Sequence, residues 1–232
     1  LPPKATTPRS HPEVALTFGD IILEANPSES YLERFHNLPL APGRWLAVDK
    51  PYQRLMTRGN FIPNVTTMFR KEDYVRAGMM DESLWVAEDG ELWSRMCSMG
   101  KFAYYCAPFA RVSRNLEDNL MASRRVRTDI ARARHKMLLR DRILTESERE
   151  KSLALLRNFL RHLLRYDLVE RGRRQMLKDL REIGFWFGRW YFVRWWALSL
   201  MPRPLARLIS HLRKVKLRRD SREFPPPGWR RR

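Results

Sequence analysis

The sequence predicts an α/β domain followed by an all-helical basic region, and two observations support that division. Residues 1–110 contain 12 Lys+Arg and 13 Asp+Glu, whereas residues 111–232 contain 33 Lys+Arg and 13 Asp+Glu. Short apolar runs typical of strands alternate with helical segments up to about residue 115, and only helical periodicity follows. We therefore expect an α/β unit over residues 1–115, a helical basic region over residues 116–219 and a disordered end over residues 220–232.

Turn residues and apolar runs define the expected elements of the first region. A buried strand is predicted over residues 14–18, with Gly19 and Asp20 as a bend beyond which residues 21–23 continue it. Residues 25–45 are expected to be irregular because three prolines interrupt them. The remaining expected elements are helices over residues 50–58, 71–77 and 88–99, and strands over residues 64–69, 102–105 and 109–113.

Helical signals dominate the second region. Thr145 and Glu148 have the spacing of a capping box, which predicts that a helix starts there. One face of this helix carries Leu153, Leu156, Leu160 and Leu163. Gly172 is expected to interrupt the helices, and a last basic helix is predicted over residues 205–218.

The stretch from Gly59 to Trp93 holds the residues with the clearest chemical meaning. In order, it contains a polar strand from Thr66 to Arg70, a helix ending at Gly78, the segment Met80-Asp81-Glu82-Ser83-Leu84, the pair Glu88-Asp89, and Leu92-Trp93. Together with residues 11–20, this ordered set resembles the second half of the catalytic domain of family-2 glycosyltransferases. The resemblance covers about residues 8–120.

The resemblance implies a partial GT-A fold and an activity. Family members move a sugar from a nucleotide-sugar donor to an acceptor hydroxyl with inversion, in the synthesis of glycans, lipid-linked glycans or cell-surface polysaccharide. By resemblance Asp89 is the catalytic base, because the acceptor hydroxyl must lose a proton. A helix N-terminus would stabilise its ionised form by about 0.3–1 kcal/mol. Contacts with the acceptor or the sugar are implied for Glu88, Trp93, Asn64, Thr66 and Arg70.

Each of these residues also has a structural interpretation. Glu88 and Asp89 could form an ordinary acidic first turn of a helix. Trp93 suits core packing at least as well as a pocket wall, and Asn64 and Thr66 suit the polar edge of a strand. For the whole chain, the alternative function is a non-catalytic basic helical protein that binds nucleic acid or an anionic membrane.

The sequence departs from the family pattern in two places. The family's donor half, with an Asp-x-Asp motif that holds Mg²⁺ or Mn²⁺ on the diphosphate, has no counterpart, and no Asp-x-Asp occurs in residues 1–232. Asn115 also stands where many members carry a histidine. We therefore expect the metal ligands in a donor half outside this sequence, no metal site within it, and no transferase activity from residues 1–232 alone.

An aromatic and basic segment near the end suggests a further partner. Residues 185–200 contain four tryptophans, which favour the bilayer headgroup zone, while Arg189 and Arg194 argue against a membrane span. The chain has two cysteines outside any C-x-x-C pair, which fits a reducing compartment. We expect a cytoplasmic protein peripheral to the inner face of the membrane, and favour anionic lipid over nucleic acid because no nucleic-acid-binding motif occurs.

Overall fold

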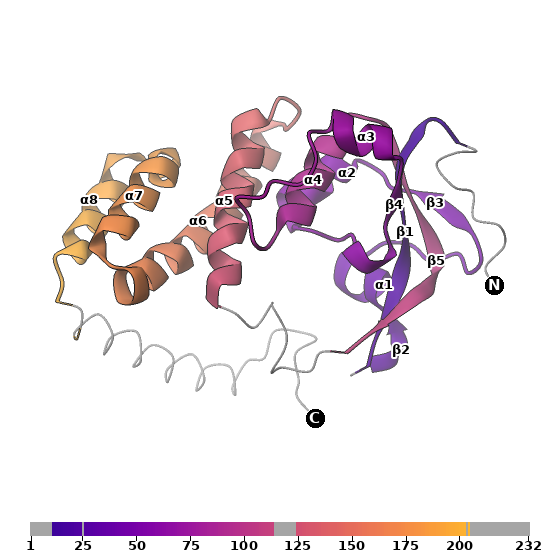
Figure 1. Ribbon diagram of the computed structural model, residues 1–232, viewed down its shortest axis with the longest axis horizontal. Helices are drawn as coiled ribbons and strands as arrows, with labels where there is room; N and C mark the ends of the chain where they lie inside the picture. The colour runs from indigo at the N-terminus through magenta and orange to yellow at the C-terminus, as the bar shows by residue number, and fades with distance from the viewer. Residues whose placement is uncertain (1–10, 25, 114–123, 203, 205–232) are drawn as a thin grey trace. The chain divides into compact units, whose positions relative to one another are not determined.

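The computed structural model describes residues 11–24, 26–113, 124–202 and 204 (Figure 1). The fold is mixed α/β, with 55% helix and 18% strand, as the sequence predicts. The chain divides into two compact units, Leu1–Leu156 and Arg157–Arg232. All described elements after residue 113 are helical, yet the first of these helices belongs to the same compact unit as the sheet.

A mixed five-stranded sheet forms the centre of the first unit. Its strands are β1 Val14–Leu23, β2 Asn26–Ser30, β3 Trp45–Ala47, β4 Met68–Phe69 and β5 Lys101–Val112. The order is β2-β1-β5-β3, and β4 also pairs with β1. The long strands β1 and β5 run parallel, whereas β2 and β4 on β1, and β3 on β5, are antiparallel.

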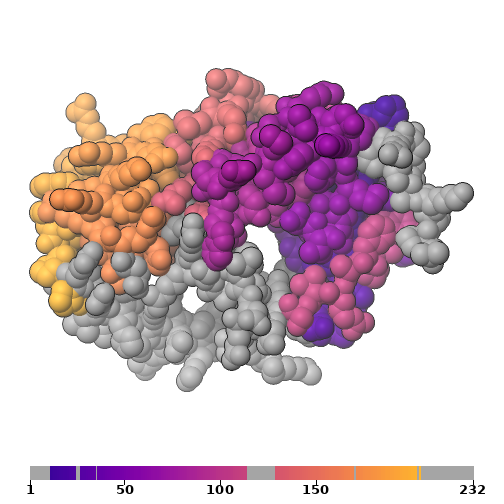
Figure 2. Space-filling view, viewed as in Figure 1, coloured from indigo at the N-terminus to yellow at the C-terminus, as the bar shows by residue number. Residues whose placement is uncertain are grey.

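The centre of β1 is buried on both faces, which explains its continuous apolar run. Leu16 and Phe18 are in register with Phe102 and Tyr104 of β5, and the Phe18 and Tyr104 rings stack at 5.7 Å. A strand buried on both faces shows this run of apolar residues instead of strict alternation. In Figure 2, violet to magenta atoms, from the residues between β1 and β5, make up most of the first unit's visible face.

Gly19 and Asp20 do not end β1, although their sequence predicts a bend. The pairing with β5 is irregular at this point, and the strand then continues to Leu23. Asp20 Oδ1 accepts hydrogen bonds from the backbone N–H groups of Ile21, at 2.8 Å, and Leu32, at 3.1 Å. A Cβ atom at Gly19 would lie 2.4 Å from the Phe109 ring, so glycine here permits a close approach between the strands.

Helices surround the sheet and make up the second unit. The first unit contains α1 Tyr31–His36, α2 Pro51–Arg58, α3 Lys71–Arg76, α4 Glu88–Met96, α5 Arg124–Arg140 and the first half of α6 Glu146–Tyr166. The second unit contains the rest of α6, α7 Arg173–Ile183 and α8 Gly188–Ser199. Figure 1 shows α2, α3 and α4 on one side of the sheet.

Three local expectations differ from the structure. Residues 26–36 form β2 and α1 where an irregular segment was expected, whereas residues 37–44, before β3, contain no helix or strand. Ser30 caps α1 by accepting a hydrogen bond from the Glu33 N–H at 3.0 Å. Residues 64–69 form a 3₁₀ turn, Asn64–Thr66, before the two-residue strand β4. The two strands expected over residues 102–113 are one strand, β5, with an irregularity opposite Asp20.

The helical predictions that depend on caps and apolar stripes were confirmed. Thr145 and Glu148 form the reciprocal capping box, with the Thr145 N–H to Glu148 Oε2 bond at 3.0 Å and the Glu148 N–H to Thr145 Oγ1 bond at 3.3 Å. On α6, Leu156, Leu160 and Leu163 are fully buried. The predicted helix over residues 205–218 and the predicted disordered end lie outside the described residues.

A buried carboxylate connects α4 with its neighbours. The Glu91 side chain is 0% exposed and accepts hydrogen bonds from the guanidinium groups of Arg95, at 2.7 to 3.1 Å, and Arg140. Arg95 also donates to the carbonyl oxygens of Ala77 and Met79. Glu91 therefore joins α4 to α5, and through Arg95 to the turn that follows α3.

Removing the Glu91 charge should destabilise the first unit. Glu91→Gln leaves two partly buried guanidinium groups without their carboxylate, and breaking a buried pair in this way costs about 3–5 kcal/mol. The free energy of unfolding, from urea denaturation, measures the loss. The exposed Glu82 serves as the control, since Glu82→Gln should change it by less than about 0.5 kcal/mol. Equal stability of the two variants would contradict the role given to Glu91.

Candidate active site

The Asp89 carboxylate lies in the first turn of α4 and has two hydrogen-bond donors. Its Oδ1 accepts the Gly90 N–H at 2.6 Å, and its Oδ2 accepts the Asn60 side-chain amide at 3.0 Å. Ala87, the residue directly before α4, has a φ of 69°, a left-handed conformation that is costly for a residue with a Cβ. Strained backbone of this kind occurs often at functional sites.

Asn60 is held so that its amide nitrogen faces Asp89. Its Oδ1 accepts the Ile62 N–H at 3.1 Å, which leaves the Nδ2 group to donate to the carboxylate. Gly59, with a φ of 103°, turns the chain between the end of α2 and Asn60. The sequence interpretation missed Asn60, although it directly follows a glycine at the end of a predicted helix, where a polar residue can be aimed at a neighbouring site.

The environment of Asp89 favours the protonated acid more than water does. Burial raises the pKa of Asp89, and the neighbouring Glu88 carboxylate raises it further. The hydrogen bonds from Gly90 and Asn60 oppose this change, because they stabilise the ionised form. The outcome is a raised pKa, and a carboxylate with a raised pKa is a better proton acceptor from a hydroxyl group.

Helix α5 positions the loop that leads to Asp89. Lys136 donates to the Asp81 carboxylate and, at 2.8 Å, to the Ser83 hydroxyl. About two turns earlier on α5, the buried Asp129 accepts a hydrogen bond from the backbone N–H of Trp85 at 3.1 Å. Residues 81–85 are therefore tied to α5 at two points, and this fixes the chain directly before α4.

Two predicted contact residues, Thr66 and Arg70, have hydrogen-bond partners within the chain. The buried Thr66 hydroxyl donates a hydrogen bond to the carbonyl oxygen of Gly19 at 2.9 Å and accepts one from the Gly19 N–H at 3.2 Å. Thr66 therefore links the 3₁₀ turn to β1. Arg70 bonds Asp73 at 2.6 Å and the carbonyl oxygen of Pro12 at 3.1 Å. Arg70 thus connects the start of α3 to the residues before β1.

The structure separates the other predicted contacts from one another. Trp93 is fully buried beside Phe69, with ring centroids 5.6 Å apart, which matches the core-packing interpretation. Asn64 is exposed and starts the 3₁₀ turn. Glu88 lies half-buried next to Asp89. Of the predicted site residues, the chain therefore brings Glu88 directly to Asp89, while Thr66, Arg70 and Trp93 support the surrounding framework.

The side chains most often found as metal ligands are not clustered in the part of the chain that the structure describes. Nowhere in this part do three or more His, Cys, Asp or Glu side chains gather around one point. Asp89 itself is engaged by two hydrogen-bond donors, not by other carboxylates.

Comparisons of the chain with protein-family models, with curated proteins and with solved structures found no match.

Changes on the two sides of Asp89 should move its pKa in opposite directions. Glu88→Gln removes a negative neighbour and should lower the pKa of Asp89, whereas Asn60→Ala removes a donor to the carboxylate and should raise it. A ¹³C NMR titration of the Asp89 carboxyl group measures both shifts. Shifts in the same direction, or none, would contradict the described arrangement.

Proposed function

We propose that this chain is the acceptor-side part of an inverting glycosyltransferase of family 2, with a GT-A fold. The observation that carries the proposal is the half-buried Asp89 carboxylate at the start of α4, whose pKa is raised and whose position is held by Asn60 and Gly90. The order of motifs around it supports the same interpretation. Donor binding, and the Mg²⁺ or Mn²⁺ that would hold the diphosphate, are assigned to residues outside this sequence.

The proposed reaction needs one proton acceptor in this part of the protein. As the acceptor oxygen bonds to the anomeric carbon, its proton passes to an Asp89 carboxylate oxygen. The bond between the anomeric carbon and the donor phosphate breaks on the opposite face, and the nucleotide leaves with the electron pair. Asn60 and the Gly90 N–H keep the carboxylate oriented during this transfer. The acceptor is a hydroxyl group of a glycan or of a lipid-linked glycan.

Asp89→Asn should remove transfer activity from the protein expressed from its complete gene. Loss of a general base lowers the rate by about 10² to 10⁴-fold. Release of nucleotide from a panel of UDP-, GDP- and dTDP-sugars, in the presence of glycan acceptors, measures the rate.

The matched control is Asp49→Asn, which removes an exposed carboxylate elsewhere in the same unit. It should leave turnover unchanged. Full activity of Asp89→Asn, or no nucleotide release from any donor with the unaltered protein, would contradict the proposal.

A second, independent function is proposed for α8, as a helix that binds an anionic membrane surface. In the described part of the chain, no helix is long and apolar enough to cross a membrane. One face of α8 nevertheless exposes Trp190, at 86%, together with Val193 and Trp196. Arg189 and Arg194 are exposed beside them. Tryptophan with arginine on one exposed face suits the headgroup zone, and would place the protein at the inner face of the membrane.

Removing the exposed indoles should weaken binding to vesicles. Trp190→Ala with Trp196→Ala should reduce the affinity for vesicles of anionic phospholipid by about tenfold or more, because each ring loses apolar burial. Sedimentation with the vesicles measures this affinity. Trp85→Ala, an exposed tryptophan of the first unit, is the control and should bind normally. Tighter binding to single-stranded oligonucleotide than to vesicles would favour the nucleic-acid alternative.

A further inference from the structure

A cavity lies at the opposite end of α4 from Asp89. It has a volume of about 320 Å³. An apolar cavity of about 150 Å³ already admits benzene, so this one has room for one or two aromatic rings. The C-terminal half of α4 and the turn after it form one wall, Tyr52 of α2 and Ala77 after α3 form others, and residues 137–143 close it. All of these elements belong to the first compact unit.

Four arginines lie around this cavity, but two of them direct their charge to a carboxylate of the framework. Arg95 and Arg140 both donate to Glu91, whose side chain is 0% exposed. A ligand that took either guanidinium group would leave the buried Glu91 charge with one partner fewer, which is costly. These two head groups are therefore held by the protein itself and do not serve a ligand.

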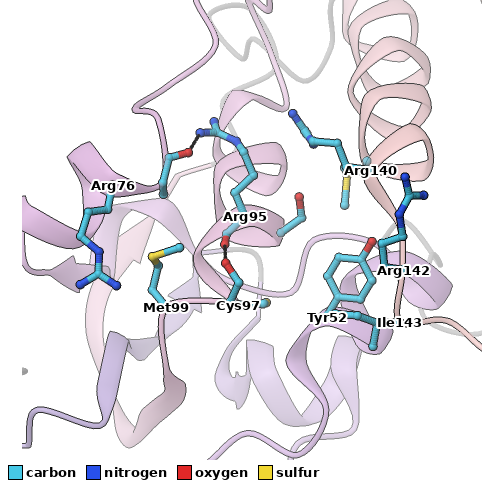
Figure 3. Close-up of a pocket in the computed structure, with 12 residues that line it drawn as sticks. Tyr52, Arg76, Arg95, Cys97, Met99, Arg140, Arg142 and Ile143 are labelled. Atoms are coloured by element: carbon cyan, nitrogen blue, oxygen red, sulfur yellow. Dashed lines mark hydrogen bonds between the residues drawn. The ribbon is translucent and has the colours of Figure 1, made fainter.

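The other two arginines, Arg76 and Arg142, point away from the cavity. Figure 3 shows their head groups at opposite margins, directed outward. Arg142 donates to the backbone carbonyl oxygen of Asp141 at 3.1 Å, and Arg76 lies 3.6 Å from the Asp73 carboxylate. What these two arginines contribute to the wall is the hydrocarbon part of their side chains.

The hydroxyl groups of the lining are also engaged within the chain. Ser94 and Ser98 donate to helix carbonyl oxygens, at 2.7 and 2.8 Å. The Tyr52 hydroxyl donates to the Asp141 carboxylate, and burial together with this carboxylate raises the pKa of Tyr52. Because these donors are occupied, a charged ligand would lose its hydrating water without gaining new hydrogen bonds in exchange.

Carbon and sulfur atoms make up the surface that remains for a ligand. Figure 3 shows Met99 and Cys97 on one side of the space, and Tyr52 and Ile143 on the other. Met137 adds a second thioether to the lining. Burial raises the pKa of Cys97, so its thiol is uncharged. Thioether sulfur packs favourably against the edge of an aromatic ring, and the unbranched methionine side chain adapts to the shape of a ligand.

We propose that this cavity binds a small uncharged molecule that has one or two aromatic rings. The rings would lie between Met99 and Tyr52 and would contact Met137 and Ile143. An aliphatic molecule of the same size gains only apolar burial, whereas an aromatic one also gains its contacts with sulfur and with the Tyr52 ring, worth about two- to tenfold in affinity. This site is independent of the proposed sugar transfer, since it uses neither Asp89 nor Asn60.

The direct test is calorimetric titration of the full chain with 2-naphthol, decahydro-2-naphthol and 2-naphthoate. A salt concentration of about 0.3 M screens the general attraction of a basic chain for an anion. The uncharged aromatic compound, 2-naphthol, should saturate one site and bind at least about twofold more tightly than either of the others. No saturable binding of 2-naphthol, equal affinity for its saturated analogue, or tighter binding of 2-naphthoate would each overturn the proposal.

Ile143 provides the variant because it lines the cavity and its side chain is 55% exposed, so its replacement leaves no hole in the core. Ile143→Ser removes apolar contact with the ligand and should weaken 2-naphthol binding by about threefold or more. The matched control is Leu139→Ser on α5, where the leucine is 50% exposed and lies outside the lining. The control should bind normally, and equal weakening in both variants would overturn the site.

Cys97 provides an independent measurement because its thiol lines the cavity, whereas Cys106 is buried in β5. Bound 2-naphthol should slow the modification of Cys97 by an uncharged maleimide, because the ligand covers the thiol. Mass spectrometry of the digested chain follows the two cysteines separately. An unchanged rate at Cys97 when 2-naphthol is saturating would place the ligand elsewhere and overturn the proposal.

Discussion

The buried Glu91 carboxylate is the interaction on which the arrangement of the first unit depends. An ion in a protein interior costs several kcal/mol unless other charges and hydrogen bonds compensate it. Arg95 on the same helix and Arg140 on α5 supply that compensation. Arg95 extends the contact to carbonyl oxygens at Ala77 and Met79. Because loss of these partners would leave the buried Glu91 charge uncompensated, α4, α5 and the turn after α3 are held in one arrangement.

This constraint governs both ends of α4. Asp89 lies in the first turn, where its orientation relative to Asn60 depends on the direction of the helix axis. The arginine-lined cavity lies at the other end, and Arg95 and Arg140 belong both to its wall and to the Glu91 network. Glu91 therefore joins the helix that carries Asp89 to two of the residues that line the cavity.

The sequence predicted those features of the fold that local chemistry determines. The α6 capping box, the buried stripe of Leu156 and Leu160, and the start of α4 at the acidic pair all follow from short-range patterns. Predictions from the sequence failed where contacts between residues far apart in the chain determine the structure. β1 passes through Gly19 and Asp20 because β5 and α1 supply the partners that a bend would otherwise need.

The same distinction applies to the candidate site. The acidic pair was visible in the sequence because the two carboxylates are adjacent. Asn60 lies 29 residues from Asp89, and its role depends on how α2 ends beside α4. Thr66 was correctly seen as polar, but its partner is the backbone of β1 and not an open surface. No spacing rule connects such pairs, so only the folded chain reveals them.

The distribution of charge changes meaning once the chain is folded. In the sequence, the positive excess begins after residue 110 and suggests a basic region devoted to an anionic partner. In the structure, the basic residues of α5 complete the neutral α/β unit: Lys136 neutralises Asp81, Arg140 neutralises Glu91, and the buried Arg134 donates to the carbonyl oxygens that end α2. These three basic side chains make contacts within the first unit. In the second unit, by contrast, exposed indole and guanidinium groups share one face of α8 and are available to an anionic surface.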